Sequence, residues 1–318
     1  MPKGGYWFIE SVLDVAAELP CAVTPTVRLE RATRLQIDVL HRRMHDEHHP
    51  LTGIPDGRVN KIVSIEHSDS RTEYQRKPLP PDQWRYFIIC YAGNGADVHE
   101  MQKICLIVDP PILFSRFIVT AQEYGSGQEL GWGGDILRQP TRGLEEIPVE
   151  PVPVITNVTI AEIQTGMSLA RAISGTYPEV YRALRMLHDL RMVPVQSSVY
   201  VLGLFAILEM LLTHQPNNRE NADSLSHQLS TKIPLIDRRM PRGLEYNALP
   251  ESDAPGRIWK NLYAYRSAIA HGVDVDFTKT FHALGDATAA RKFLEGACRR
   301  ILKHALSEPA LYRDLRAV

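Results

Sequence analysis

The sequence has few cysteines, almost no net charge and no apolar run long enough to cross a membrane. Its four cysteines lie far apart without a C-x-x-C pair, which indicates neither a zinc knuckle nor a disulfide framework and favours a reducing cytoplasm. The net charge of −1 argues against a protein that coats nucleic acid through bulk electrostatics, since such proteins are usually strongly basic. The longest apolar run, residues 199–212, contains Glu209 and is shorter than the roughly 20 residues that span a bilayer. We therefore expect a cytoplasmic protein that does not enter a membrane.

The sequence also lacks the common phosphate-binding and export patterns. The glycine-rich stretch 124–135 is followed by no Gly-Lys-Ser/Thr and contains no G-x-G-x-x-G helix entry, so we expect no nucleotide cofactor and interpret it as a hairpin or a partner surface. Near the N-terminus, Glu10, Asp14 and Glu18 interrupt any secretory apolar region and favour a helix there, so we expect no export. Arginine outnumbers lysine 27 to nine. That bias suits phosphate recognition, although a GC-rich genome produces it without a chemical reason.

The chain of 318 residues is long enough for two domains, and its pattern changes near residue 150. Residues 1–150 are expected to form a mixed α/β, strand-rich domain of unknown role, a candidate sensor or restraint. Its predicted strands are the runs rich in β-branched and aromatic residues at 58–67, 84–92, 103–109 and 116–124. One helix is expected to begin with Thr24 as N-cap and Pro25 at the first helical position. Three prolines within 145–156 favour an extended boundary segment.

Residues 151–318 are almost entirely helical in pattern, which makes the whole chain α+β. Two S/T-x-x-E capping boxes, 159–162 and 176–179, each precede apolar periodicity and predict helix starts. Further helices are expected around 198–213, 220–236, 256–272 and 286–306. These elements predict an all-α bundle in the second domain.

The helix at 256–272 carries the most informative residues. Its apolar positions follow i, i+4, i+7 and i+11 from Ile258 to Ile269, and Gly272 is a typical residue just past a helix end. At 100° per residue, Arg266 lies about 80° to one side of Ile258 and His271 about 140° to the other, so the pair flanks the core stripe without stacking. A histidine at a helix C-terminus has a structural reason to be there, because the helix dipole favours a positive charge. The spacing R-x4-H also occurs at Arg43 and His48, and about one match is expected by chance.

The context of the second match resembles a known family. The stretch "FAILEMLL" at 205–212, followed by "LSHQLSTKIPLI" at 225–236 and "YAYRSAIAHG" at 263–272, resembles the HEPN superfamily in its Apea-like branch. The resemblance covers about residues 157–310, half of the chain, and implies a HEPN-like helical bundle there. It implies nothing about residues 1–150.

The resemblance implies a metal-independent endoribonuclease centre at a homodimer interface, containing Arg266 and His271. Arginine is always charged and suits a phosphate, whereas histidine can act as base or acid near neutral pH. Ser267 could orient the substrate or the histidine, and Glu209 could face Arg266 or Ser267 and order the site, or pair with another basic side chain. Many active members have Asn, Asp or His after the arginine, where this chain has Ser267.

The sequence also offers candidate residues for substrate and metal binding. Candidate substrate-binding residues are Tyr263, Lys292, Arg299 and Arg300; the last three, with Lys303, could line an RNA track on the final helix, although a solvated face is the more common explanation. The implied biological role is that of a toxin or antiviral defence effector, with RNA as substrate and a neutralising partner protein to restrain it. The alternative is a non-catalytic HEPN-fold module for dimerisation or RNA binding. A metal site at His41, His45 and His48 is less common at such a spacing than a solvated helix end.

Overall fold

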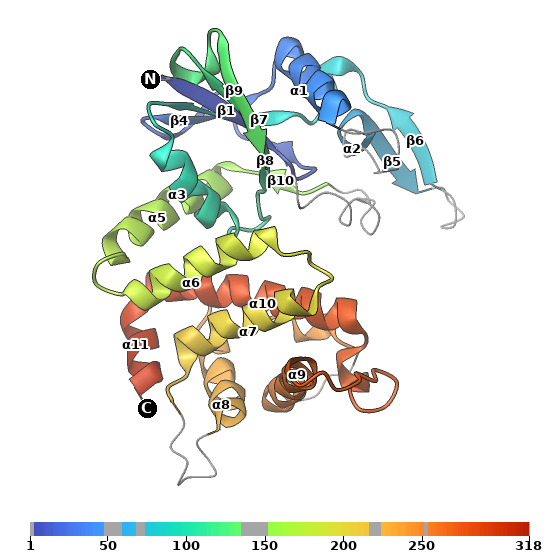
Figure 1. The fold of residues 1–318 in the computed structure, drawn as a ribbon, viewed down its shortest axis with the longest axis vertical. Helices are drawn as coiled ribbons and strands as arrows, with labels where there is room; N and C mark the ends of the chain where they lie inside the picture. The colour runs from blue at the N-terminus through green and yellow to red at the C-terminus, as the bar shows by residue number, and fades with distance from the viewer. Residues whose placement is uncertain are drawn as a thin grey trace. The chain divides into compact units, whose positions relative to one another are not determined.

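The computed structural model describes residues 3–47, 59–67, 74–134, 152–215, 224–250 and 254–317. The chain divides into two compact units, Met1–Met167 and Ser168–Val318. The first unit is strand-rich and the second is helical, as the sequence predicts (Figure 1). The division falls inside helix α5 (Asn157–Ile173), later than the boundary near residue 150 that the prolines predict.

The first unit is built on a six-stranded antiparallel sheet with the order β3-β4-β7-β1-β8-β9. Its strands are β1 (Gly4–Ile9), β3 (Cys21–Thr24), β4 (Val27–Arg31), β7 (Phe87–Ala92), β8 (Phe114–Thr120) and β9 (Glu129–Gly134). Two smaller pairs accompany it: parallel β2 (Asp14–Val15) with β10 (Val154–Ile155), and antiparallel β5 (Val63–His67) with β6 (Tyr74–Pro78). In the described parts of this unit, the helices are α1 (Arg34–Glu47), α2 (Val59–Ile62), α3 (Ala96–Cys105) and the first part of α5.

Helix α1 packs on one face of this sheet. Tyr6, Phe8 and Ile88 belong to one buried cluster with Ile37 and Leu40 of α1. On the other side of β1, Trp7 makes an edge contact with His99 of α3. The central strand β1 is therefore covered on both faces, which explains why its side chains are nearly all buried.

The helix predicted for the N-terminus is wrong, because residues 4–9 form strand β1. Gly4 and Gly5 let the neighbouring backbones approach closely: a Cβ atom at Gly4 would lie 2.4 Å from the Tyr91 carbonyl oxygen, and one at Gly5 would lie 2.3 Å from that of Ile118. The acidic residues on which the helical pattern depended follow this strand. A strand buried on both faces loses the alternation that distinguishes it from a buried helix.

The predicted helix start at Thr24 and Pro25 is also wrong. These residues lie at the turn between β3 and β4, where Thr24 pairs with Val27. Helix α1 begins after Thr33, whose hydroxyl accepts from the Gln36 backbone N–H while the Gln36 side chain accepts from the Thr33 N–H. This reciprocal capping box marks the true start of the helix.

The other predicted strands of the first unit had mixed outcomes. The stretch 84–92 contains all of β7, 116–124 contains most of β8, and 58–67 contains β5 after the short α2. The stretch 103–109 is not a strand: it is the end of α3 and the turn after it, apolar because it is buried. The glycine-rich stretch contains β9, which forms a hairpin with β8.

The second unit contains α6 (Pro178–Asp189), α7 (Ser198–Leu212), α8 (Leu225–Asp237), α9 (Pro255–Ala270), α10 (Ala287–Ser307) and α11 (Pro309–Ala317), with the end of α5. Helix α7 is the hub, because it packs against α6, α8, α9, α10 and α11. Its apolar composition on all sides fits this central position. None of the helices in the described parts of the chain is both long and apolar enough for a membrane span.

The helix starts in this unit differ in detail from the predicted capping boxes. Helix α5 begins three residues before the box at 159–162, because Thr156 and Thr159 exchange hydrogen bonds between hydroxyl and backbone N–H. Helix α6 has Tyr177 as N-cap, without a side-chain cap. The other predicted helices are confirmed as α7, α8, α9 and α10, whereas α11 was not predicted.

Candidate functional site

Helix α9 positions the residues singled out in the sequence. Its buried side chains are Ile258, Trp259, Leu262 and Tyr265, which anchor the helix in the bundle. Ile269, predicted to extend this core stripe, is only partly buried, because it lies in the last turn of the helix.

The helix ends in a tight cap at His271 and Gly272. The Gly272 N–H donates to the Ile269 carbonyl and the Val273 N–H to the Ala268 carbonyl. Gly272 has φ of +65°, the left-handed conformation that glycine adopts at low cost. The His271 backbone N–H donates to the Ser267 carbonyl at 3.0 Å, and its side chain is exposed. The cap therefore fixes the backbone of His271 while the imidazole remains open to solvent.

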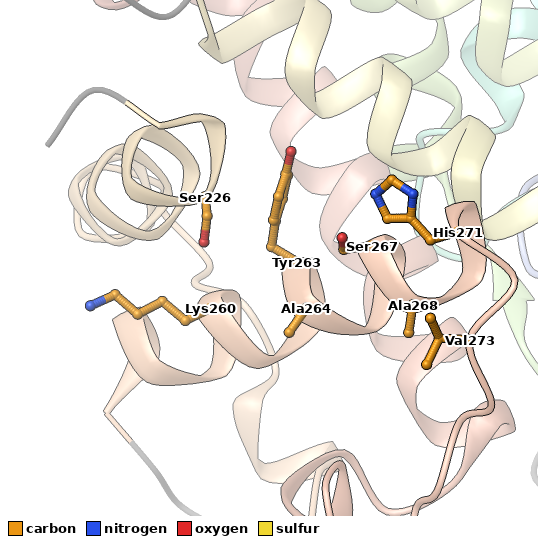
Figure 2. A pocket seen from close by; sticks show the side chains of 8 residues that line it. All are labelled: Ser226, Lys260, Tyr263, Ala264, Ser267, Ala268, His271 and Val273. Atoms are coloured by element: carbon orange, nitrogen blue, oxygen red, sulfur yellow. The ribbon is translucent and has the colours of Figure 1, made fainter. Parts of the chain in front are cut away.

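Three polar side chains of α9 and its C-cap lie on one face of the helix. Tyr263, Ser267 and His271 are spaced by four residues, so they lie along one side of the helix. They line a surface pocket of about 420 Å³ (Figure 2). Its other lining residues are Lys260, Ala264, Ala268 and Val273 from α9 and the segment after it, and Ser226 from α8. The pocket thus joins an aromatic ring, a hydroxyl and an imidazole along one helix.

Arg266 lies beside this face and is held by Glu209 of α7. An Arg266 Nη2 atom is 3.4 Å from Glu209 Oε1, and the guanidinium carbon lies 5.6 Å from the centre of the Tyr263 ring. The Tyr263 ring in turn makes an edge contact with Phe205, at 6.1 Å between ring centres. Of the two alternatives for Glu209, the structure therefore has the carboxylate facing Arg266. Arg266 does not itself line the pocket.

The ion pair lies in a partly dehydrated environment. The side chains of Arg266 and Glu209 are 28% and 19% exposed, and the Arg266 Nε and Glu209 Oε1 atoms are buried without a hydrogen-bond partner among the described residues. Burial raises the pKa of the Glu209 carboxyl, and the Arg266 guanidinium opposes that rise. Burial and the nearby Glu209 also raise the pKa of the Tyr263 phenol, which therefore remains a proton donor at neutral pH.

The basic residues predicted on the last long helix lie elsewhere. Arg299 pairs with Glu295 on α10, and Arg300 pairs with Glu245 and donates to the Gly243 carbonyl at 2.6 Å. This contact with Arg300 lowers the pKa of Glu245. Lys292 is exposed on the same helix. None of these three basic residues lines the pocket.

Two polar pocket residues, Lys260 and Ser226, were missed in the sequence, as were the apolar lining residues Ala264, Ala268 and Val273. Lys260 lies one helical turn before Tyr263, and this i−3 spacing was a usable signal. Ser226 belongs to α8, and no local pattern places it against α9.

The structure describes only part of the possible histidine metal site. His41 Nε2 lies 2.9 Å from the Tyr86 hydroxyl. His48 and the side chain of His45 lie outside the described residues. Within the described part of the chain, no three histidine, cysteine, aspartate or glutamate side chains are grouped as metal ligands.

No family model, no curated protein and no solved structure matches this chain.

Proposed function

We propose that this protein is a metal-independent endoribonuclease of HEPN type that acts as a homodimer. The observation that carries the proposal is the row of Tyr263, Ser267 and His271 along one pocket, with Arg266 fixed beside it by Glu209. Histidine can supply the base and the acid, and arginine the positive charge, that phosphodiester cleavage by an RNA's own 2′-hydroxyl uses.

The proposed reaction needs no outside reactant. The 2′-oxygen attacks phosphorus while a base takes the 2′-hydroxyl proton, and the bond from phosphorus to the 5′-oxygen breaks as an acid protonates that oxygen. The products are a 2′,3′-cyclic phosphate and a 5′-hydroxyl. Arg266 stabilises the charge that gathers on the phosphate oxygens in the transition state.

Two copies of the site fit this chemistry better than one. A single His271 cannot be neutral as the base and protonated as the acid at the same time, whereas two copies across a two-fold axis can divide the roles. Within one chain, Arg266 lies off the pocket that His271 lines. A second copy is one way to bring the guanidinium of one chain to the phosphate attacked at the other.

The cellular role is proposed from the HEPN resemblance. The protein would act in the cytoplasm as a toxin or antiviral defence effector, with a neutralising partner protein to restrain it and without a metal or cofactor. The first unit is a candidate sensor or restraint.

A non-catalytic HEPN-fold module for dimerisation or RNA binding is the second candidate. It is favoured by Ser267 after the arginine and by the ion pair that holds Arg266 toward α7. In this case RNA would bind to the pocket and stay intact.

One cleavage experiment distinguishes the proposed nuclease from the binding module and from a metal nuclease. Only the proposed nuclease uses the RNA's own 2′-hydroxyl as nucleophile and cuts without a metal ion. Purified protein is incubated with RNA, the cut position is mapped, and an RNA with one 2′-deoxy ribose at that position is compared with the unmodified one, each with and without EDTA. We expect cleavage of the unmodified RNA in EDTA, no cleavage of the deoxy RNA, and none by His271→Ala. Cutting of the deoxy RNA, or activity lost in EDTA and restored by magnesium, would contradict the mechanism. Intact RNA in every reaction would favour the binding module.

A further inference from the structure

The pocket extends well beyond the residues that the proposed chemistry uses. Lys260 lies at the end opposite His271, with Tyr263 between them (Figure 2). The eleven residue steps from Lys260 to His271 correspond to about 16 Å along a helix axis. A substrate that reaches both ends must therefore be longer than the group cleaved at His271.

The chemistry of this extension changes along the pocket. The Tyr263 ring is half-buried and its orientation is fixed by the edge contact with Phe205, so it offers a preorganised stacking surface. Ala264 and Ala268 beside it have side chains small enough to leave room for a flat ring. Lys260 is exposed, so an anion in solution can reach its ammonium group.

Size and shape favour one kind of nucleic acid. A pocket of about 420 Å³ falls in the range of small-molecule sites and is far too small for a double helix. Bases in a duplex are stacked and paired, so a base can lie against Tyr263 only where the strand is single and the base unstacked. Ser226 on α8 adds a hydroxyl that can donate to or accept from a base edge.

We propose that this pocket binds single-stranded RNA, with one unstacked base on Tyr263 and the phosphate of a neighbouring nucleotide on Lys260, away from the bond to be cut. The proposal rests on the proposed function and names its substrate class. It makes Lys260, Tyr263 and Ser226 determinants of binding rather than of the chemical step.

The test is direct binding, measured by fluorescence anisotropy on the full chain. The probe is a labelled single-stranded RNA of mixed sequence with 2′-O-methyl riboses, which cannot be cut through the 2′-hydroxyl. Lys260→Gln should weaken binding and reduce the slope of log K against log salt by about 0.7, the value for one phosphate contact on a single strand. Arg185→Gln removes one charge from an exposed position on α6 and should leave the slope unchanged.

Stacking is tested by paired substitutions at Tyr263. Tyr263→Leu should weaken binding by about 5-fold to 150-fold, whereas Tyr263→Phe, which keeps the ring, should bind almost as wild type does. The same probe annealed to its complement should bind much more weakly. For cleavage of unmodified RNA, Lys260→Gln should raise KM and leave kcat nearly unchanged.

The outcomes separate this proposal from the nuclease proposal. If RNA is cut but Lys260→Gln and Tyr263→Leu bind the probe as wild type does, the proposed RNA contacts at Lys260 and Tyr263 are wrong and the nuclease proposal stands. If RNA stays intact but both substitutions weaken binding as described, the nuclease proposal is wrong and the RNA contacts stand. Equal affinity for single-stranded and duplex probes, or no binding of the wild-type chain to the probe, would overturn the proposed binding of single-stranded RNA.

Discussion

Replacing Glu209 by glutamine tests whether its ion pair with Arg266 supports cleavage or stabilises the fold. At 3.4 Å and an effective dielectric constant near 20, the attraction between the two charges is about 5 kcal/mol before desolvation is subtracted. The raised pKa of Glu209 means that desolvation outweighs this attraction, because the ionised carboxylate is disfavoured in the folded chain. We therefore expect Glu209→Gln to change the free energy of unfolding at neutral pH by less than about 1 kcal/mol.

The same reasoning fixes the sign of the pH dependence. A carboxyl whose pKa is raised on folding binds more protons in the folded state between its unfolded value, about 4.3, and its folded value. The contribution of Glu209 to the free energy of unfolding therefore increases as the pH falls through this window and is smallest above it. The difference in stability between wild type and Glu209→Gln should shift in favour of wild type at mildly acid pH.

Glu209→Gln should lower the cleavage activity even though it changes the free energy of unfolding little. Without the carboxylate, Arg266 loses its only described ion-pair partner and samples more rotamers, so cleavage should fall although the fold is intact. Glu308→Gln is the control, because it removes a carboxylate from an ion pair with Arg239, 2.8 Å apart, and from a contact with His304, both outside the pocket. The assays are urea unfolding and initial cleavage rates on all three proteins. A loss of about 3 kcal/mol or more on Glu209→Gln, typical of breaking a stabilising buried pair, would refute the reasoning, as would wild-type cleavage.

Two further predictions concern Arg266 and His271 of the proposed active site. Arg266→Ala should reduce cleavage about 100-fold to 1,000-fold, as expected for the loss of one transition-state donor worth about 2.7–4 kcal/mol. The unfolding transition should change little, and wild-type cleavage rates in the folded variant would make Arg266 a structural residue. Dimerisation through α9 should accompany activity, because the two protonation states of His271 require two copies; sedimentation of a fully active monomer would contradict the shared site.

Local patterns in the sequence were enough to predict most of the helical unit. Helix α9 was recognised from its apolar spacing and from Gly272, and α10 is capped by Asp286, which accepts from the Ala289 N–H. These signals involve residues within one or two turns of each other, so they can be read without knowing the fold. The positions of Tyr263, Ser267 and His271 on one face follow from the same helical geometry.

Only the tertiary structure decided what these residues meet. Glu209 faces Arg266, and Ser226 reaches the pocket, because α7 and α8 pack against α9, and no local pattern encodes that packing. Arg300 was a candidate for RNA binding from its sequence, yet its guanidinium is engaged by the segment at Gly243. The N-terminal strand was mistaken for a helix for the same reason, since residues 4–9 become a strand by pairing with β7 and β8, far along the chain. Periodicity reports which face of an element is apolar, whereas the identity of the neighbour depends on contacts between segments that are distant in sequence.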